Sequence, residues 1–217
     1  MDKRTNLILI WSVAIVIIAF FVYIVVTNIG PGSLNNDELG KINKTDYTWG
    51  NPEALVTIIE YSDLQCPACA YIHSSLIKPL LEDYGDKVHY AFRHFPLKNI
   101  HPQAVAAARA LEAAGAQGKF WEMQDILFES QEEWSNKSDP KEKFNVYAQD
   151  LGLNLEKFKT DSSSSKYLKL IEDSYDFAVD NGLNYTPSIV LNGELIDNPK
   201  SVDEFKAVID GAINNAS

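Results

Sequence analysis

The sequence predicts an α/β domain in which two strand-containing segments enclose a block of helices, preceded by one transmembrane helix. Three observations lead to this order: a strand, helix, strand pattern over residues 55–95, helical periodicity over about 101–182, and a strand, turn, strand pattern with a final helix after Pro187. Because parallel strands need a crossover connection and such connections are right-handed, the first segment predicts a right-handed parallel βαβ unit.

The N-terminal segment is read as a membrane anchor. From Leu7 to Val26 the only clearly polar side chain is Ser12, and a helix of this length crosses a hydrocarbon core of about 30 Å. Lys3 and Arg4 precede the run, so the positive-inside rule predicts a cytoplasmic N-terminus and an extracytoplasmic domain. A cleaved signal peptide is the alternative, but its apolar region is usually about 7 to 15 residues long. We therefore predict an uncleaved anchor within residues 1–29.

The rest of the chain, residues 49–217, is long enough for one domain with a sizeable core, and a Gly-, Asn- and Asp-rich tether is predicted over residues 30–48. The formal net charge of −11 argues against a nucleic acid partner, because phosphate binding needs clustered Lys and Arg. Only two cysteines occur, three positions apart, so no long loop is closed by a disulfide. The pair is expected to be chemical rather than architectural.

The βαβ unit is predicted to begin with a short, β-branched apolar run over Leu55–Tyr61, which is typical of a buried strand. The chain then enters a helix, because Pro67 suits a first helical turn. This helix is expected to kink near Lys78, where Pro79 follows. The second strand is predicted over Val88–Phe95, where apolar and polar residues alternate.

The second half of the domain is predicted as a helical insertion over about 101–182, followed by a hairpin and a helix. After Pro187, the apolar runs Ser188–Leu191 and Glu194–Ile196 flank an Asn-Gly turn, which is the strongest short-range signal of a β-hairpin. The residues Ser201–Glu204 form a capping box, and apolar residues at helical spacing follow them. The C-terminal segment is therefore predicted to be ββα.

The two cysteines form the motif Cys66-Pro67-Ala68-Cys69, where the first predicted strand ends and the helix begins. The first sulfur is expected to face the unpaired amides and the positive end of the helix dipole, which favours a thiolate. In such motifs the pKa of the exposed thiol commonly falls to roughly 3.5 to 7.5. Cys66 is therefore predicted to be the nucleophile, and Cys69, one turn inside the helix, to resolve the mixed disulfide with a substrate.

A structural disulfide or half of a zinc site is the alternative for such a pair. Zinc normally takes four ligands, no second CxxC motif occurs, and only one of the four histidines lies near the pair in sequence. We therefore predict no metal or cofactor. Thiolates also suit Cu(I), so a soft-metal binding module stays an alternative from a different class. The histidines are otherwise expected to be ordinary surface or packing residues: His73, His89, His94 and His101.

Two further features are candidates for redox chemistry. Glu60 lies inside the first apolar strand, six positions before Cys66, where burial of a carboxylate is costly. If it is buried near Cys69 it is able to accept the proton of that thiol, and the alternative is that strand alternation turns it to a solvated face. Thr186 and Pro187 directly precede the hairpin, where a proline is either a cis residue or simply the start of a strand.

Several segments together resemble the DsbA-like branch of the thioredoxin superfamily, in the membrane-anchored form found in many bacteria. They occur in the order of that family and cover about residues 49–213. The matching segments are Gly50–Val56, Glu60–Cys69, Phe92–Leu97, Ala116–Met123 and Thr186–Ser188. The resemblance implies a thioredoxin-like fold, βαβ … ββα, with a helical insertion.

The resemblance also implies roles for particular residues. It implies an active-site disulfide between Cys66 and Cys69, a substrate-facing loop formed by Thr186 with cis-Pro187, and Glu60 as the buried acid of the family. The strongest oxidants of the family carry a histidine before the second cysteine, and this chain has Ala68 there, which leaves the oxidising strength open. Arg93 and His94 match the family and are expected to have structural or surface roles.

The function implied is that of a disulfide donor to newly exported proteins. The resemblance implies as partners these thiol-containing substrates, the membrane, and a quinone-linked membrane protein that re-oxidises the pair. A disulfide reductase or isomerase is the alternative enzyme.

Overall fold

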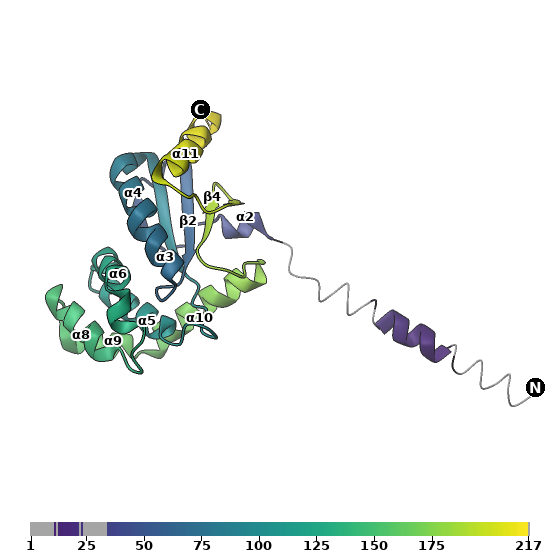
Figure 1. The fold of residues 1–217 in the computed structure, drawn as a ribbon, viewed down its shortest axis with the longest axis horizontal. Helices are drawn as coiled ribbons and strands as arrows, with labels where there is room; N and C mark the ends of the chain where they lie inside the picture. Colours follow the sequence, from purple (N-terminus) through teal and green to yellow (C-terminus); the bar gives the residue numbers. More distant parts are fainter. Residues whose placement is uncertain (1–10, 12, 22, 24–33, 217) are drawn as a thin grey trace, which may run out of the picture. The chain divides into compact units, whose positions relative to one another are not determined.

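The computed structural model describes residues 11, 13–21, 23 and 34–216, and the chain divides into two compact units, 1–34 and 35–217. In the first unit the described residues 11, 13–21 and 23 are helical (Figure 1). Within the residues that the structure describes, no helix combines the length and apolar character needed to cross a membrane. The predicted span reaches from 7 to 26, and its residues 7–10, 12, 22 and 24–26 lie outside the described residues. The anchor therefore stays a prediction.

The second unit is built on a mixed sheet of five strands in the order β1-β3-β2-β4-β5. The central strands β2 (Val56–Ser62) and β3 (Val88–His94) are parallel, which confirms the predicted βαβ unit. Strands β4 (Ser188–Leu191) and β5 (Glu194–Ile196) form the predicted antiparallel hairpin, whose turn residues Asn192 and Gly193 both have positive φ. Strand β4 pairs antiparallel with β2, which brings the hairpin beside the first strand.

Residues 35–48 differ from the predicted tether, because they contain helix α2 (Asn36–Leu39) and the start of strand β1 (Tyr47–Gly50). Strand β1 pairs antiparallel with β3, and Leu39 is fully buried. At the end of β1, Gly50 has a φ of +87°, and a Cβ there would lie 2.1 Å from the carbonyl oxygen of Val88. Gly50 therefore permits the close approach of the end of β1 to Val88 at the edge of the sheet.

Both faces of the sheet are covered, so strand alternation leaves few polar side chains in solvent. One face packs on the helix after Cys66, which runs from α3 (Pro67–Ile72) to α4 (Lys78–Tyr84), and on α11 (Val202–Ala216). The core on this face includes Ile58, Tyr90 and Ile189. The other face packs on α2 and on α10 (Ser165–Asp180), through a smaller core that includes Ile59. In β3 the expected alternation is lost after His89, because the residues that follow it in the strand are all buried.

The helix after Cys66 contains a wider turn. Helix α3 (Pro67–Ile72) continues into a π-helical segment over His73–Ile77 and then into α4 (Lys78–Tyr84). The predicted irregularity near Lys78 is thus spread over the five residues before it. A wider turn accommodates Pro79, which has no N–H to donate to the preceding turn.

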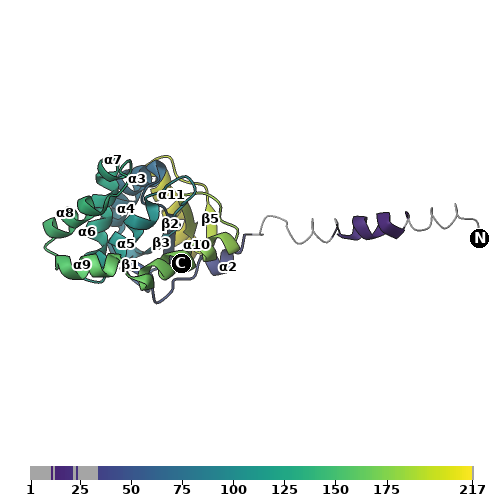
Figure 2. The ribbon, with the colours of Figure 1, turned by 90° about the horizontal axis from the view of Figure 1, so that it is seen from below.

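The predicted insertion forms a group of six helices between β3 and β4. The views in Figure 1 and Figure 2 show α5, α6, α8 and α9 grouped together at one side of the sheet. The further helices have these bounds: α5 (Ala104–Gly115), α6 (Phe120–Glu129), α7 (Gln131–Trp134), α8 (Lys141–Asp150) and α9 (Leu155–Ser162). Helix α6 contacts α3 and the π-helical turn, which places the insertion against the helix that carries the cysteines.

Candidate active site

Cys66 lies at the N-terminus of α3, as predicted, with the extended backbone conformation of an N-cap residue. The N–H of Cys66 donates to the carbonyl oxygen of Asp63 at 3.0 Å, and the side chain of Gln131 donates to the carbonyl oxygen of Cys66 at 3.1 Å. These bonds hold the turn between β2 and α3. Both cysteines are free thiols, so the structure is that of the dithiol form. Cys66 is 7% exposed and Cys69 is fully buried, so only the first sulfur borders solvent.

The surroundings of Cys66 favour its thiolate. Its pKa falls from 9.0 to about 6, first because the Cys69 thiol donates a hydrogen bond to it, an effect that outweighs burial. The backbone N–H groups of Cys69 and Ala68 and the side chain of Thr186 add to this. A thiolate near neutral pH is both a nucleophile and a good leaving group.

Cys69 has the opposite character. Burial raises the pKa of its thiol well above 9.0, and the nearby charges of Cys66 and Glu60 raise it further. The N–H of Asp63 donates to its sulfur at 3.5 Å, which fixes the sulfur beneath the end of β2. The pair is therefore asymmetric: one sulfur is ionised near neutral pH, and the other keeps its proton.

The loop before β4 lies against the first cysteine. The Thr186–Pro187 peptide bond is cis, and the Cys66 thiol donates to the carbonyl oxygen of Thr186 at 3.7 Å. The pairing of Ser188 with Tyr61 carries this loop to the end of β2, across 120 positions of sequence from Cys66. The buried Thr186 hydroxyl meets no partner of ordinary hydrogen-bond geometry among the described residues, yet it lies near enough to lower the pKa of Cys66.

Glu60 is fully buried, so the solvated-face alternative is wrong. It shares a sheet face with Ile58 and Tyr90, and the α3–α4 helix covers that face. The Tyr90 hydroxyl donates to its Oε2 atom at 2.6 Å. Burial raises the pKa of the Glu60 carboxyl, and the carboxylate charge in turn raises the pKa of Cys69. The structure thus brings together the predicted acid and the thiol whose proton it is predicted to exchange.

Asp63 is a functional candidate that the sequence analysis missed. It is 1% exposed and binds three partners of the loops beside the cysteines: the N–H of Gln65 and that of Leu97, both at 2.7 Å, and the ring of His101 at 2.8 Å. The available signal was an acidic residue directly after a buried strand and just before the CxxC motif. Asp63 therefore organises the turn that presents Cys66.

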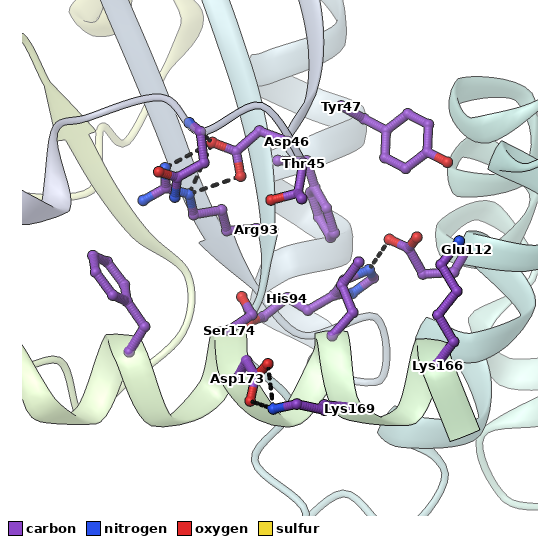
Figure 3. A pocket seen from close by; sticks show the side chains of 14 residues that line it. Thr45, Asp46, Tyr47, Arg93, His94, Glu112, Lys166, Lys169, Asp173 and Ser174 are labelled. Atoms are coloured by element: carbon purple, nitrogen blue, oxygen red, sulfur yellow. Dashed lines mark hydrogen bonds and ion pairs between the residues drawn. The ribbon is translucent and has the colours of Figure 1, made fainter. Parts of the chain in front are cut away.

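Arg93 and His94, expected to be structural or surface residues, are buried, and they line a cavity of about 390 Å³ between β3 and α10 (Figure 3). Arg93 pairs with Asp46 at 2.7 Å and His94 with Glu112 at 2.9 Å. Neither cysteine borders this cavity. Arg93 and His94 thus have a structural role. The sequence had suggested either a structural or a surface role for them.

The arrangement of a CxxC dithiol at a helix N-terminus, with a cis-proline loop beside it, defines the class of protein: a thioredoxin-like protein with a dithiol site. The model of the thioredoxin family matches residues 42–211. The chain belongs to the thioredoxin family and, within that superfamily, to its DsbA-like members.

Solved structures of thiol-disulfide oxidoreductases resemble this fold. The structure of alpha-DsbA1 from Wolbachia pipientis superposes with a TM-score of 0.72 at 25% identity, covering 84% of this chain and 97% of that chain. A thioredoxin-like oxidoreductase from Silicibacter pomeroyi has a TM-score of 0.67 at 26% identity, covering 83% of this chain and 98% of that chain. The fold of this chain is therefore similar to that of solved oxidoreductases. BdbD from Bacillus subtilis shares the fold, with a TM-score of 0.68 at 22% identity over 85% of this chain and 97% of that one.

Curated proteins with similar sequences are named as Na(+)/H(+) antiporters. An antiporter called Na(+)/H(+) antiporter NhaA 1, from Mycolicibacterium gilvum, is 39% identical over 153 residues, which are 69% of this chain and 24% of that protein. Na(+)/H(+) antiporter NhaA 3 from Salinispora tropica is 34% identical over 171 residues, 79% of this chain and 25% of that protein. The chain therefore spans about a quarter of the length of these curated relatives.

Proposed function

We propose that this protein is an extracytoplasmic thiol-disulfide oxidoreductase that donates the disulfide of Cys66 and Cys69 to exported proteins. The observation that carries the proposal is the asymmetry of the pair, because burial and hydrogen bonds give the two sulfurs opposite proton affinities. In a donor, a substrate thiolate attacks Cys66 Sγ, and the bond to Cys69 breaks. A second substrate thiolate then attacks the substrate sulfur of the mixed disulfide. Cys66 leaves as a thiolate, and the substrate has gained a disulfide.

The surface beside Cys66 supports a protein substrate. Tyr71, two positions after Cys69 on α3, is 57% exposed, and Tyr185, next to Thr186, is 42% exposed. Exposed aromatic side chains of this kind bind apolar segments of other chains. The loop that contacts Cys66 thus carries one exposed aromatic side chain, Tyr185, and the helix that begins after Cys66 carries another, Tyr71. Both suit the binding of an unfolded polypeptide with an exposed thiol.

The first prediction concerns the stability of the two redox forms. A folded-state pKa below the unfolded value stabilises the dithiol form fully above the unfolded pKa of 9.0, and this contribution is lost as pH falls through the folded value of about 6. At pH 7 it amounts to about 1 kcal/mol after allowance for solvent screening, which corresponds to a melting temperature difference of about 2 to 4 °C. We expect the dithiol form to have a higher melting temperature than the disulfide form at pH 7. At pH 5 the difference between the two melting temperatures is expected to be about 2 to 4 °C smaller.

Thermal unfolding of the full-length protein in mild detergent, followed by circular dichroism with and without reductant, measures this difference. The Cys66→Ser variant is the matched control, because it has no disulfide and its melting must not depend on the reductant. A disulfide form that is clearly the more stable at pH 7 would assign the protein to the reductases. A difference that stays constant from pH 5 to pH 8 would contradict the lowered pKa of Cys66.

The proposed location rests on the N-terminal segment. The described residues of this segment form a helical stretch whose large apolar side chains, such as Ile15, Ile18 and Phe21, are exposed. Exposed apolar surface of this size favours a membrane environment. With Lys3 and Arg4 before it, the proposed anchor leaves the cysteines on the extracytoplasmic side, where a quinone-linked membrane protein would re-oxidise them.

The second prediction is that the protein resists extraction from membranes at alkaline pH, because a helix of about 20 apolar residues inserts stably. Membranes from cells that express the full chain are washed with carbonate, and the protein is followed with an antibody to its C-terminal domain. We expect the protein to stay in the membrane pellet. We also expect protease added to spheroplasts to digest the domain, because the proposed orientation places it outside the cytoplasm. Recovery of a soluble form that lacks the first thirty residues would show cleavage instead.

A further inference from the structure

A second cavity lies inside the helical insertion. It has a volume of about 270 Å³ and is bounded by α5, α8 and α9, three helices that contact one another (Figure 1). Part of its wall is apolar, because Ala106 and the buried side chains of Phe144 and Phe158 line it. Neither cysteine lines this cavity, so it is separate from the dithiol site. Cavities that bind small molecules are typically mostly apolar, with a few polar groups that fix the orientation of the ligand.

Arg109 on α5 brings a positive charge to this cavity. Its Nε atom is buried and has no hydrogen-bond partner among the residues that the structure describes. Within the same residues its guanidinium makes no ion pair, and it makes one long hydrogen bond, from Nη2 to the carbonyl oxygen of Ser164 at 3.4 Å. A buried charged donor without an acceptor is costly, and the planar guanidinium matches a carboxylate in shape. The missing acceptor therefore points to an anionic group in the cavity.

Two further cations line the cavity, Lys141 at the start of α8 and Lys159 on α9. Each ammonium group lies 3.6 Å from an exposed carboxylate, and exposed ion pairs of this kind hold a side chain only weakly. One carboxylate also lines the cavity, that of Glu142, which accepts from Asn145 at 3.4 Å. The described lining therefore carries three cations and one carboxylate, although the net charge of the chain is −11.

The larger cavity between β3 and α10 has a different arrangement of charges. Each of three basic side chains there has a carboxylate partner within 2.9 Å: Arg93, His94 and Lys169 (Figure 3). The ammonium group of a fourth, Lys166, lies over the ring of Tyr167. The polar groups of that cavity thus satisfy one another, and they leave no need for a ligand. The guanidinium of Arg109, in contrast, has no counter-charge within the described part of the chain.

We propose that the cavity between α5, α8 and α9 binds a small organic carboxylate with an apolar body. The carboxylate accepts hydrogen bonds from Arg109, and the apolar body packs on Phe144 and Phe158. Lys141 and Lys159 attract the anion to the cavity. The volume of about 270 Å³ lies near the lower end of the range for small-molecule sites, about 300 to 1,000 Å³, so the ligand is compact. This inference goes beyond the proposed function, because it involves neither cysteine.

Isothermal titration calorimetry of the full-length protein in non-ionic detergent tests this, with 3-phenylpropionate as the probe and a titration of the detergent alone as the blank. We expect one site per chain in the wild type. Arg109→Gln should raise the Kd about tenfold, because hydrogen bonds between two charged groups are lost. The uncharged analogue 3-phenylpropionamide should also bind the wild type about tenfold more weakly than the carboxylate does. Its Kd should not differ between the wild type and Arg109→Gln, because the partner of the guanidinium is already absent.

Lys169→Gln is the matched control, because it also removes one positive charge but lines the cavity between β3 and α10. Its Kd for 3-phenylpropionate should equal that of the wild type. A Kd that Lys169→Gln raises and Arg109→Gln leaves unchanged would place the carboxylate in the other cavity and overturn the inference. So would the absence of binding to the wild type at millimolar concentrations. Either result would leave the proposed thiol exchange intact, because the titrations do not depend on it.

If Arg109→Gln does not fold, Ala106→Leu decides, because it keeps every charge and fills part of the cavity. It should weaken binding of 3-phenylpropionate, and an unchanged Kd would overturn the inference. A last titration separates a small molecule from the end of a polypeptide, which presents the same chemistry. The dipeptide acetyl-alanyl-phenylalanine carries the same ring and a free carboxylate on a peptide backbone. Tighter binding of this dipeptide than of 3-phenylpropionate would assign the cavity to a polypeptide C-terminus and overturn the small-molecule assignment.

Discussion

Replacing Cys66 with Ser is expected to lower thiol exchange by roughly a thousandfold or more, because no other sulfur of the described site borders solvent. Replacing Cys69 with Ala has a different result. Cys66 keeps its thiolate character in part and still attacks substrate disulfides, but the mixed disulfide has no internal thiol to resolve it. We expect a mixed disulfide with substrate to accumulate in Cys69→Ala and to be absent in Cys66→Ser.

Incubation of each reduced variant with a protein or peptide disulfide, followed by non-reducing electrophoresis, measures this. Both variants are first checked by thermal unfolding, since Cys69 is fully buried and its truncation leaves a small cavity. Mixed disulfides that appear in the Cys66 variant and not in the Cys69 variant would reverse the assigned roles. Their absence from both would remove the CxxC motif from the chemistry.

The second large effect is expected on stability. Asp46 and Arg93 form a buried ion pair, with side-chain exposures of 8% and 4% and a shortest distance of 2.7 Å. Arg93 also donates to the Tyr61 hydroxyl at 2.6 Å and to the carbonyl oxygen of Lys41. Asp46→Ala leaves the guanidinium buried without its counter-charge, which costs about 3 kcal/mol or more. We expect the melting temperature to fall by about 6 to 12 °C.

Thermal unfolding of the full-length protein tests this, with Asp37→Ala as the matched control. Asp37 is an exposed acid of α2 in the same segment, so its removal changes the net charge equally without breaking a buried pair. Equal melting temperatures for the two variants would mean that residues 35–46 contribute little to the folded domain. They would then behave as the tether that composition suggests.

The environment of Glu60 depends on the fold and not on the strand pattern alone. Strand periodicity puts Glu60 and Ile58 on one face, but it left open whether that face is solvated or covered. The α3–α4 helix covers it, and burial then raises the pKa of the carboxyl. The same limit applies to β3, where Arg93 and His94 are polar in sequence and buried in the fold. The segment before β1 and helix α10 lie against Arg93, and helices α5 and α10 lie against His94.

Features that depend on short segments could be predicted from the sequence: the dithiol motif at a strand-to-helix junction, the parallel βαβ unit, and the Asn-Gly hairpin. These follow from periodicity, turn chemistry and capping, which act between residues close in the chain. Which distant segments meet was visible in the folded domain alone. The fold brought Thr186 to Cys66 and His73 to Asp125, and it added β1 to the sheet edge. Such contacts depend on the packing of whole elements, which no local pattern specifies.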